Sequence, residues 1–214
     1  MALDRIHIED RETWLGTRNE VGIGGSEASA ILGLNPWMDA TKLYRIKTGI
    51  ETPKEIVGNE FIDRGVRMED GLRHMFSCLH PELTVEHYPF DILRQTECPW
   101  LFATLDGELI GQDGKRGILE IKTAQPKGKV GWDEWKEAVP QKYYVQVLHQ
   151  LLATGYEYAY LFAALFSQSG DITLREYEFQ RQDCLPDMKY LLGKEETFYC
   201  DVKQRRIPTI TITL

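Results

Sequence analysis

The alternation of apolar and polar positions between residues 101 and 123 predicts a β-hairpin. Two apolar runs flank a glycine-rich segment at 111–117, which is typical of a hairpin with a longer loop. Side chains alternate across a strand, so Glu120 and Lys122 share one face of the second strand. Asp106 ends the first strand and lies beside Glu120 if the strands pair. The pattern therefore predicts two carboxylates and an ammonium group at one place.

A helix is predicted from Asn59 to Leu79 because apolar residues recur there at spacings of three and four. Its expected inward stripe is Phe61, Gly65, Met68, Leu72, Met75, Phe76 and Leu79. Glu69 borders this stripe and needs a partner, because an unpaired buried charge is costly. Arg73, one turn later, is one candidate partner. A metal ion is the other.

The remaining periodicity favours a mixed α/β fold with a central sheet flanked by helices. Helices are expected at 26–32, 39–47, 141–154 and 183–203, and strands at 83–93, 156–166 and 171–180. Residues 51–58 and 126–139 are expected to form loops. Residues 207–214 are β-prone and are expected to pair with a sheet edge or to pack on a neighbouring subunit. The whole of 1–214 is interpreted as one domain.

The glycine-rich segment at 22–26 admits two interpretations. Ser26 is a plausible N-cap for the helix that follows, which makes the segment a capped surface turn. A helix N-terminus next to glycines also presents free N–H groups that favour an anion. No GK[ST] sequence follows, so the segment is not a P-loop.

Charge and cysteine content narrow the class of protein. The 214 residues carry a net charge of −8, which argues against nonspecific coating of nucleic acid but allows an enzyme with a local basic channel. Cys78, Cys98, Cys184 and Cys200 form no CxxC pair and are expected to be reduced thiols of a cytoplasmic protein, without a zinc or iron–sulfur site. No apolar run is long enough to span a membrane, and the charged first residues lack the apolar core of a signal peptide.

The carboxylates of the hairpin suggest a metal site. Carboxylates held close together repel unless a cation lies between them, and Mg²⁺ takes one or two carboxylates together with water and phosphate oxygens. Such a metal acidifies water and stabilises charge on a phosphodiester, and a lysine beside it can orient that water. The alternative is a surface hairpin with an exposed Glu/Lys pair, because the D…ExK pattern is short and common.

Two further segments admit a functional and a plain interpretation. Lys127, Lys129, Trp132 and Trp135 interleave basic and aromatic side chains, which suits DNA contact, although the tryptophans could equally anchor their loop to the core. Gln146 and Gln150 lie one turn apart on the 141–154 helix. They could be solvated surface amides.

Taken together, several motifs resemble those of the YqaJ-like viral recombinase family, which includes the phage lambda-type alkaline exonucleases and belongs to the PD-(D/E)xK nuclease superfamily. The matching stretches extend from Trp14 to Gly155 in the expected order. They are WLGTR, GIGGSEASAILGLNPW, RGVRMEDGLR, TLDGEL, ILEIKT and YYVQVLHQLLATG.

The resemblance implies a role for each matching residue. Asp106 and Glu120, with the carbonyl of Ile121, would bind Mg²⁺, for which Mn²⁺ would substitute, and Lys122 would position the attacking water. Glu69 would support a second metal or its waters, and Gln146 would contact the scissile region. Arg18 and Ser26 would hold the DNA 5′-phosphate.

The sequence departs from the family pattern at three points. One extra residue separates Arg18 from Ser26, Leu148 replaces a common glutamine, and Leu105 replaces a proline.

The resemblance also implies a function. The protein would be a processive 5′→3′ exonuclease that digests one strand of linear duplex DNA to 5′-mononucleotides and leaves 3′ single-stranded tails. It would form a homotrimeric ring and pass the tail to a single-strand annealing protein. Two alternatives remain: a PD-(D/E)xK endonuclease, which would cut closed circular DNA, and a non-catalytic DNA-binding or scaffold protein on the same fold.

Overall fold

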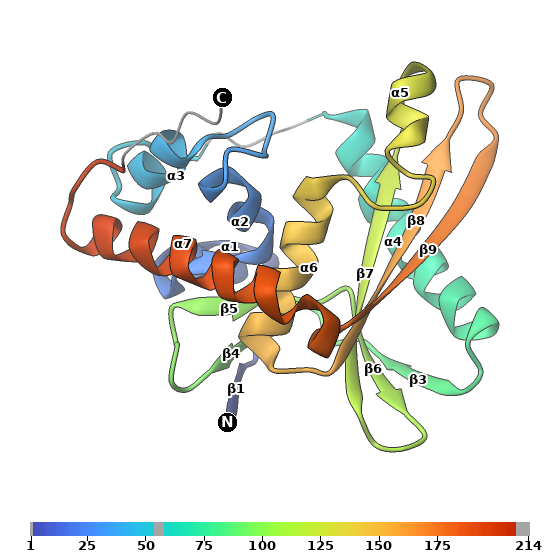
Figure 1. Ribbon diagram of the computed structural model, residues 1–214, viewed down its shortest axis with the longest axis horizontal. Helices are drawn as coiled ribbons and strands as arrows, with labels where there is room; N and C mark the ends of the chain where they lie inside the picture. The colour runs from blue at the N-terminus through green and yellow to red at the C-terminus, as the bar shows by residue number, and fades with distance from the viewer. Residues whose placement is uncertain (1, 54–57, 209–214) are drawn as a thin grey trace.

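A computed structural model describes residues 2–53 and 58–208 and shows two β-sheets with helices around them (Figure 1). The larger sheet has the order β3-β6-β7-β8-β9, and its neighbouring strands are antiparallel except β7 and β8. Its strands are β3 (Leu83–Glu86), β6 (Gly107–Gly111), β7 (Arg116–Ala124), β8 (Tyr158–Phe166) and β9 (Ile172–Gln180). The expected α/β class and PD-(D/E)xK-like fold are confirmed.

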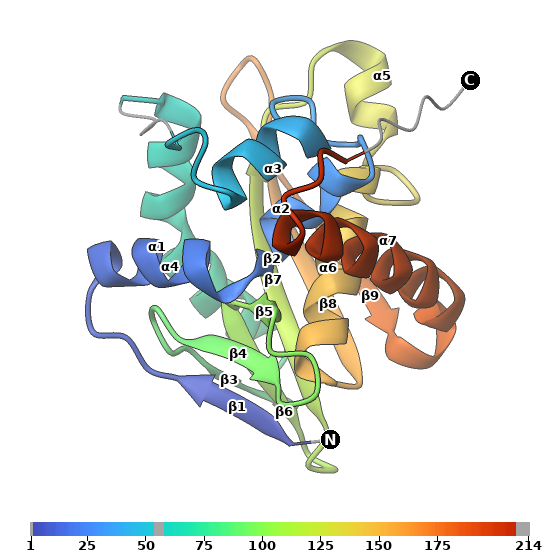
Figure 2. The same ribbon diagram turned by 90° about the vertical axis from the view of Figure 1, so that its left-hand side faces the viewer.

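The sequence pattern does not predict the smaller sheet, whose order is β1-β4-β5-β2. Its strands are β1 (Leu3–Ile6), β2 (Ile23–Gly24), β4 (Ile92–Gln95) and β5 (Leu101–Ala103). Strands of two to four residues are too short to show a period. The fold therefore has two sheets where one central sheet was expected, and Figure 2 shows the smaller one beside α1.

Helices occupy most of the remaining chain. They are α1 (Arg11–Val21), α2 (Gly25–Ile31), α3 (Ala40–Lys47), α4 (Glu60–Leu79), α5 (Gly128–Asp133), α6 (Gln141–Thr154) and α7 (Leu185–Lys203), with a short 3₁₀ helix, η1 (Arg181–Cys184). The predicted limits of α6 are confirmed, whereas α1 and α5 were not predicted. Within the described ranges, none of these helices has the length and apolar character needed to cross a membrane.

Strand β8 is buried on both faces, as its nearly continuous apolar sequence indicates. On one face Ala159, Leu161, Ala163 and Leu165 pack with Val147, Leu148 and Leu151 of α6. On the other face Tyr158, Phe162, Ala164 and Phe166 pack with Leu72 and Phe76 of α4. Helices α6 and α4 thus cover opposite faces of the larger sheet (Figure 1), and α6 makes the crossover that the parallel pair β7 and β8 requires.

The predicted hairpin is only partly correct. Its second strand and glycine turn form as expected, but residues 101–111 divide into β5 and β6, which belong to different sheets. Asp106 therefore lies in the link between two strands and not at the end of one. The expected strand at 83–93 is likewise wrong as a unit: β3 and β4 lie in different sheets, and Pro89, which has no N–H to donate, lies between them.

Two local expectations need correction. The N-cap of α2 is Gly24, and its N–H donates to the Glu27 carboxylate at 3.0 Å, so Ser26 is not the cap. Phe61, Met75 and Leu79 of α4 are exposed, whereas Leu72, Arg73 and Phe76 form its buried face. Met75 is one residue, or about 100°, around the helix from Phe76 and so leaves that face. The loop expected at 51–58 lies partly outside the described residues. The strand expected at 207–214 lies mostly outside them.

Candidate active site

Asp106 and Glu120 come together, as the alternation along β7 predicts. Leu119 and Ile121 pack on the α4 side of the sheet, which directs Glu120 and Lys122 to the α6 side. Asp106 reaches the same strand from the link between β5 and β6, where its Oδ2 accepts a hydrogen bond from the Ile121 N–H at 2.7 Å. The Asp106 carboxylate is therefore held beside β7 at Ile121, the residue next to Glu120.

The Glu120 carboxylate is almost fully enclosed, with 1% of the residue exposed. Its Oε1 accepts a hydrogen bond from Gln146 Nε2 at 2.6 Å and makes a short ion pair with Lys122 Nζ. Its Oε2 accepts from Gln150 Nε2 at 2.5 Å. Both oxygens are thus held, which fixes the carboxylate in one orientation.

Gln150 is the residue of this site that the sequence interpretation did not assign. It is 1% exposed, and its amide nitrogen also lies 3.4 Å from the Thr104 carbonyl in the link that carries Asp106. Its Oε1 is buried without a hydrogen-bond partner in the described structure. The spacing of four from Gln146 places both amides on one helical face, so the expectation of solvated surface amides is wrong for Gln150, and Gln146 also bonds to Glu120.

Glu69 lies near the carboxylates and is paired with Arg73, the plainer of its two expected partners. Arg73 Nη2 donates to Glu69 Oε1 at 2.7 Å, and Nη1 donates to Asp70 at 2.9 Å. The same guanidinium donates through Nε to the Asp106 carbonyl at 2.6 Å. Arg73 therefore connects α4 to the link that carries Asp106.

The electrostatics of the site follow from this crowding. Burial, and after it the charge of Glu120, raises the pKa of Asp106 well above its usual range, although Lys122 opposes the change. Burial also raises the pKa of Glu69, against the charge of Arg73. For Lys122, burial alone lowers the pKa, but Glu120 and Asp106 outweigh it and raise the pKa above the ordinary value. Lys122 is thus a charged ammonium at neutral pH.

The donor set fits Mg²⁺ in kind. Among the described residues no three His, Cys, Asp or Glu side chains converge closely enough to hold a metal by themselves. Mg²⁺ does not need such a set, because it takes one or two carboxylates and completes its octahedron with water and substrate oxygens. Burial raises the pKa of Asp106, the negative charge of Glu120 raises it further, and repulsion of this kind is what a bound cation relieves.

Arg18 and Ser26 are brought together, with Arg18 Nη2 3.2 Å from Ser26 Oγ. The Arg18 guanidinium also lies over the Trp14 ring, 4.4 Å from its centroid. Ser26 is exposed and Arg18 is half-buried. Because Gly24 is the N-cap of α2, the Ser26 hydroxyl is not needed to cap that helix. The extra residue between Arg18 and Ser26 does not prevent their contact.

Gly25 connects this pair to the carboxylate site. A Cβ atom at position 25 would lie 3.2 Å from Gln146 Cγ and 3.4 Å from Gln150 Cγ. The absence of a side chain lets α2 pack directly on the two glutamines that hold Glu120. Ser26 of α2 and the two glutamines of α6 that hold Glu120 therefore lie on helices in direct contact.

The loop between β7 and α6 is anchored to the core, as the plainer interpretation expects. Trp135 is 3% exposed, and its carbonyl accepts a short hydrogen bond from the Tyr177 hydroxyl. Trp132 packs against the same cluster. Lys127 and Lys129 are exposed.

Comparisons with known proteins agree with this architecture. Residues 13–157 match the model of the YqaJ-like viral recombinase domain. The uncharacterized protein YqaJ of Bacillus subtilis (strain 168) is 33% identical over 178 residues, which are 83% of this chain and 52% of that protein. This chain thus spans about half the length of that relative.

Two solved structures have the same fold at low identity. An alkaline exonuclease, LHK-Exo, from Laribacter hongkongensis aligns with a TM-score of 0.67 and 16% identity, covering 91% of this chain and 94% of that one. A phage-related exonuclease from Haemophilus somnus 129PT aligns with a TM-score of 0.56 and 13% identity, covering 89% and 99%. The family match, the relative and the shared fold together show that this chain belongs to the YqaJ-like viral recombinase family.

Proposed function

We propose that the protein is a Mg²⁺-dependent 5′→3′ exonuclease whose nuclease domain spans residues 1–214. It processively digests one strand of linear duplex DNA to 5′-mononucleotides and leaves 3′ single-stranded tails for annealing recombination. The observation that carries the proposal is the arrangement of Asp106, Glu120 and Lys122 on and beside β7 in a chain of this family.

Asp106, Glu120 and the Ile121 carbonyl are the proposed ligands of Mg²⁺, with Mn²⁺ as a substitute and Glu69 supporting a second ion or its waters. When bound, Mg²⁺ would acidify water and stabilise negative charge on the phosphodiester. Gln146 and Gln150 hold the Glu120 oxygens in place, so that the ligand is oriented before the metal arrives.

Lys122 is the proposed group that positions the attacking water. Its raised pKa keeps it protonated, so it acts as a hydrogen-bond donor and positive charge and not as a general base. It also makes an ion pair with Glu120. Gln146, which is only partly buried, is placed to contact the substrate beside Glu120.

Arg18 and Ser26 are the proposed ligands of the terminal 5′-phosphate. A guanidinium binds phosphate through parallel hydrogen bonds, and Ser26 adds a hydroxyl in the first turn of α2. The direct packing of α2 on α6 at Gly25 places this pair close to the carboxylate site.

A ring-shaped homotrimer and a single-strand annealing protein are the proposed partners. A ring that encloses DNA supplies processivity without a strongly basic surface, which agrees with the net charge of −8. Light scattering at working concentration tests the assembly, and a monomer mass contradicts it.

The function is tested by incubating linear and closed circular duplex DNA with the protein and Mg²⁺, with the linear duplex labelled at either 5′ or 3′ ends. The expected products are labelled mononucleotides from the 5′-labelled duplex and shortened strands from the 3′-labelled one, with circular DNA intact. Cutting of the circle identifies an endonuclease. Absence of cleavage, with DNA binding retained, identifies a binding protein. Asp106→Ala and Glu120→Ala controls exclude a contaminating nuclease.

A further inference from the structure

The turn at Asn35–Trp37 exposes a large aromatic side chain close to the candidate active site. Trp37 is 72% exposed. Its backbone is nevertheless fixed, because the Trp37 N–H donates to the Asn35 side chain at 2.9 Å. An indole held in water on an ordered turn offers a flat apolar surface for stacking.

Trp37 is the outer end of a row in which cations and aromatic rings alternate. Lys142 Nζ lies 4.4 Å from the centroid of the Trp37 ring and 4.9 Å from that of Tyr143. The Tyr143 ring in turn lies 5.4 Å from Lys122 Nζ. The row therefore runs from the catalytic lysine to the surface, and only its last ring is widely exposed.

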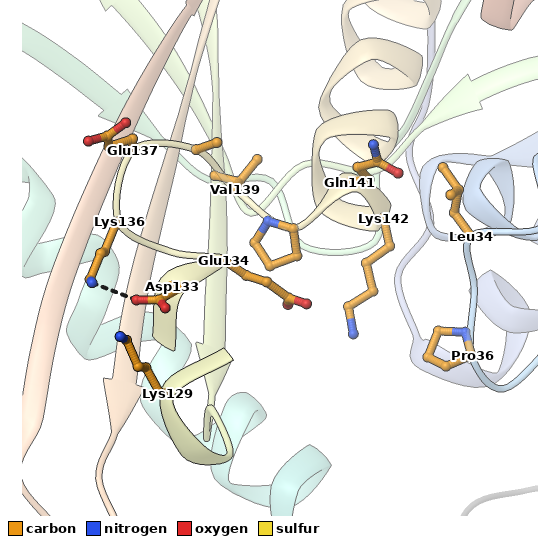
Figure 3. Close-up of a pocket in the computed structure, with 12 residues that line it drawn as sticks. Leu34, Pro36, Lys129, Asp133, Glu134, Lys136, Glu137, Val139, Gln141 and Lys142 are labelled. Carbon is orange, nitrogen blue, oxygen red and sulfur yellow. Dashed lines mark ion pairs between the residues drawn. The ribbon is translucent and has the colours of Figure 1, made fainter. Parts of the chain in front are cut away.

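An open cavity of about 840 Å³, drawn in Figure 3, is lined in part by Lys142 of this row. Leu34 and Pro36 line one side, and the segment from Lys129 to Pro140 lines the other, with Lys142 extending between them. Asp133 is neutralised by Lys136 at 2.5 Å. Among the described residues Lys142 makes no ion pair, although the charge of Glu134, on the same cavity, acts on it; its ammonium therefore has hydrogen-bonding capacity left for a ligand.

We propose that Trp37, Lys142 and Tyr143 form a subsite for unpaired DNA next to the candidate active site, in which a nucleobase stacks on Trp37 and a backbone phosphate contacts Lys142. The inference rests on the proposed nuclease function and names the part of the substrate that this face binds. Base stacking on an aromatic ring is a sequence-tolerant way to hold a single strand beside the site.

The chain contains a matched control for this row. Tyr190 on α7 is 61% exposed, and Lys194 Nζ lies 5.4 Å from its ring centroid. That pair has the same chemistry, but α7 does not contribute to the carboxylate site. If any exposed aromatic ring beside a lysine bound DNA, Tyr190 would do so as well.

The test measures binding of a short 5′-phosphorylated single-stranded oligodeoxynucleotide by fluorescence anisotropy, with Ca²⁺ in place of Mg²⁺. Trp37→Ala is expected to weaken binding about tenfold, whereas Trp37→Phe and Tyr190→Ala stay close to wild type. Lys142→Gln is expected to reduce the salt dependence of binding by about one phosphate contact, and Lys194→Gln leaves it unchanged.

Oligonucleotides with a single abasic position give the decisive comparison. At one position along the oligonucleotide, the abasic site is expected to weaken wild-type binding as much as Trp37→Ala does. The same abasic site should cause no further loss of affinity in Trp37→Ala. Equal losses in Trp37→Ala and Tyr190→Ala, or the same abasic penalty in wild type and Trp37→Ala, overturn the subsite. Cleavage by wild type with Mg²⁺ is measured separately, so failure of the nuclease proposal is distinguishable from failure of the subsite.

Discussion

Gln150 and Glu120 lie 30 residues apart in the chain, yet the Gln150 amide donates to Glu120 Oε2 at 2.5 Å, while Gln146 and Lys122 contact the other oxygen. A carboxylate held from both sides cannot rotate freely. Its orientation is therefore set by α6 before any ligand binds.

Gln150→Leu is expected to weaken Mg²⁺ affinity by about 10–100-fold, because groups that orient a ligand are worth roughly that much. Isothermal titration calorimetry measures the change without relying on catalysis. Gln112→Leu, at an exposed position in the turn between β6 and β7, is the control for replacing an amide by an apolar group. Unchanged Mg²⁺ affinity in Gln150→Leu shows that the amide does not orient the ligand.

Asp106→Asn is expected to stabilise the metal-free protein while abolishing cleavage. Burial and Glu120 raise the pKa of Asp106, so the folded state disfavours its ionised form. The resulting destabilisation begins near the unfolded pKa of about 4 and grows until the pH exceeds the raised folded pKa. The gain of Asp106→Asn over wild type in EDTA, measured by denaturant titration, should therefore increase with pH.

Mg²⁺ should make wild type more stable than Asp106→Asn, the reverse of their order in EDTA. It stabilises wild type by binding the folded state and has little effect on Asp106→Asn. A variant that is less stable than wild type in EDTA at neutral pH, or that gains as much from Mg²⁺, contradicts the assignment.

Lys122→Met is expected to lose the chemical step but to retain DNA binding in Ca²⁺. Single-turnover cleavage and anisotropy separate the two effects. The variant should also lose about 3 kcal/mol of metal-free stability, because it leaves Glu120 buried without its cation. If DNA affinity falls and the single-turnover rate is unchanged, Lys122 is a phosphate contact.

Ser26→Ala is expected to change the free energy of unfolding by no more than about 0.5 kcal/mol, because Gly24 and not Ser26 caps α2. Preference for 5′-phosphorylated over 5′-hydroxyl linear DNA should nevertheless be lost, as in Arg18→Ala. Thr96→Ala, at an exposed position between β4 and β5, is the control substitution. If Ser26→Ala and Arg18→Ala both keep the preference for 5′-phosphorylated DNA, the phosphate binds elsewhere.

His80 makes one contribution to stability that depends on pH. Its ring bridges Glu82 at 2.9 Å and Glu176 at 2.8 Å and stacks on Phe76. Burial alone lowers the pKa of His80, but the bonds to Glu176 and Glu82 outweigh it and raise the pKa.

The stabilisation by His80 is therefore complete below about pH 6.5 and is lost as the pH rises through the raised folded pKa. His80→Gln should lower the Tm at pH 6, by about 2–4 °C for each kcal/mol lost, and much less at pH 9. A Tm difference that does not vary with pH assigns the effect to packing.

The elements that the sequence predicts correctly have ends that are marked by nearby residues. Helix α6 has a long apolar period and a left-handed glycine, Gly155, directly after it. Helix α4 begins after Asn59, whose side chain accepts hydrogen bonds from the N–H groups of Phe61 and Ile62. In both cases residues within one or two turns decide the outcome.

The features that the sequence does not reveal depend on distant contacts. The division of the predicted hairpin at Asp106 depends on Arg73, which holds the Asp106 carbonyl from 33 residues away. His149, buried in α6, pairs with Glu195 of α7 at 2.6 Å across 46 residues. Gln150 resembles any amide on a polar helix face until Glu120 is placed opposite it. Local periodicity contains no information about such partners.

The contact at Gly25 also sets a distance within the site. Because only a hydrogen atom separates the backbone of α2 from Gln146 and Gln150, the distance between Ser26 of α2 and the Glu120 carboxylate held by α6 is set by the thickness of one backbone. A methyl group at that position would press on Gln146 Cγ, and the Gln146 side chain would have to move by a few tenths of an ångström. In the proposed exonuclease, this close approach of two helices would fix the distance from the bound strand end to the cut, and with it the length of the product.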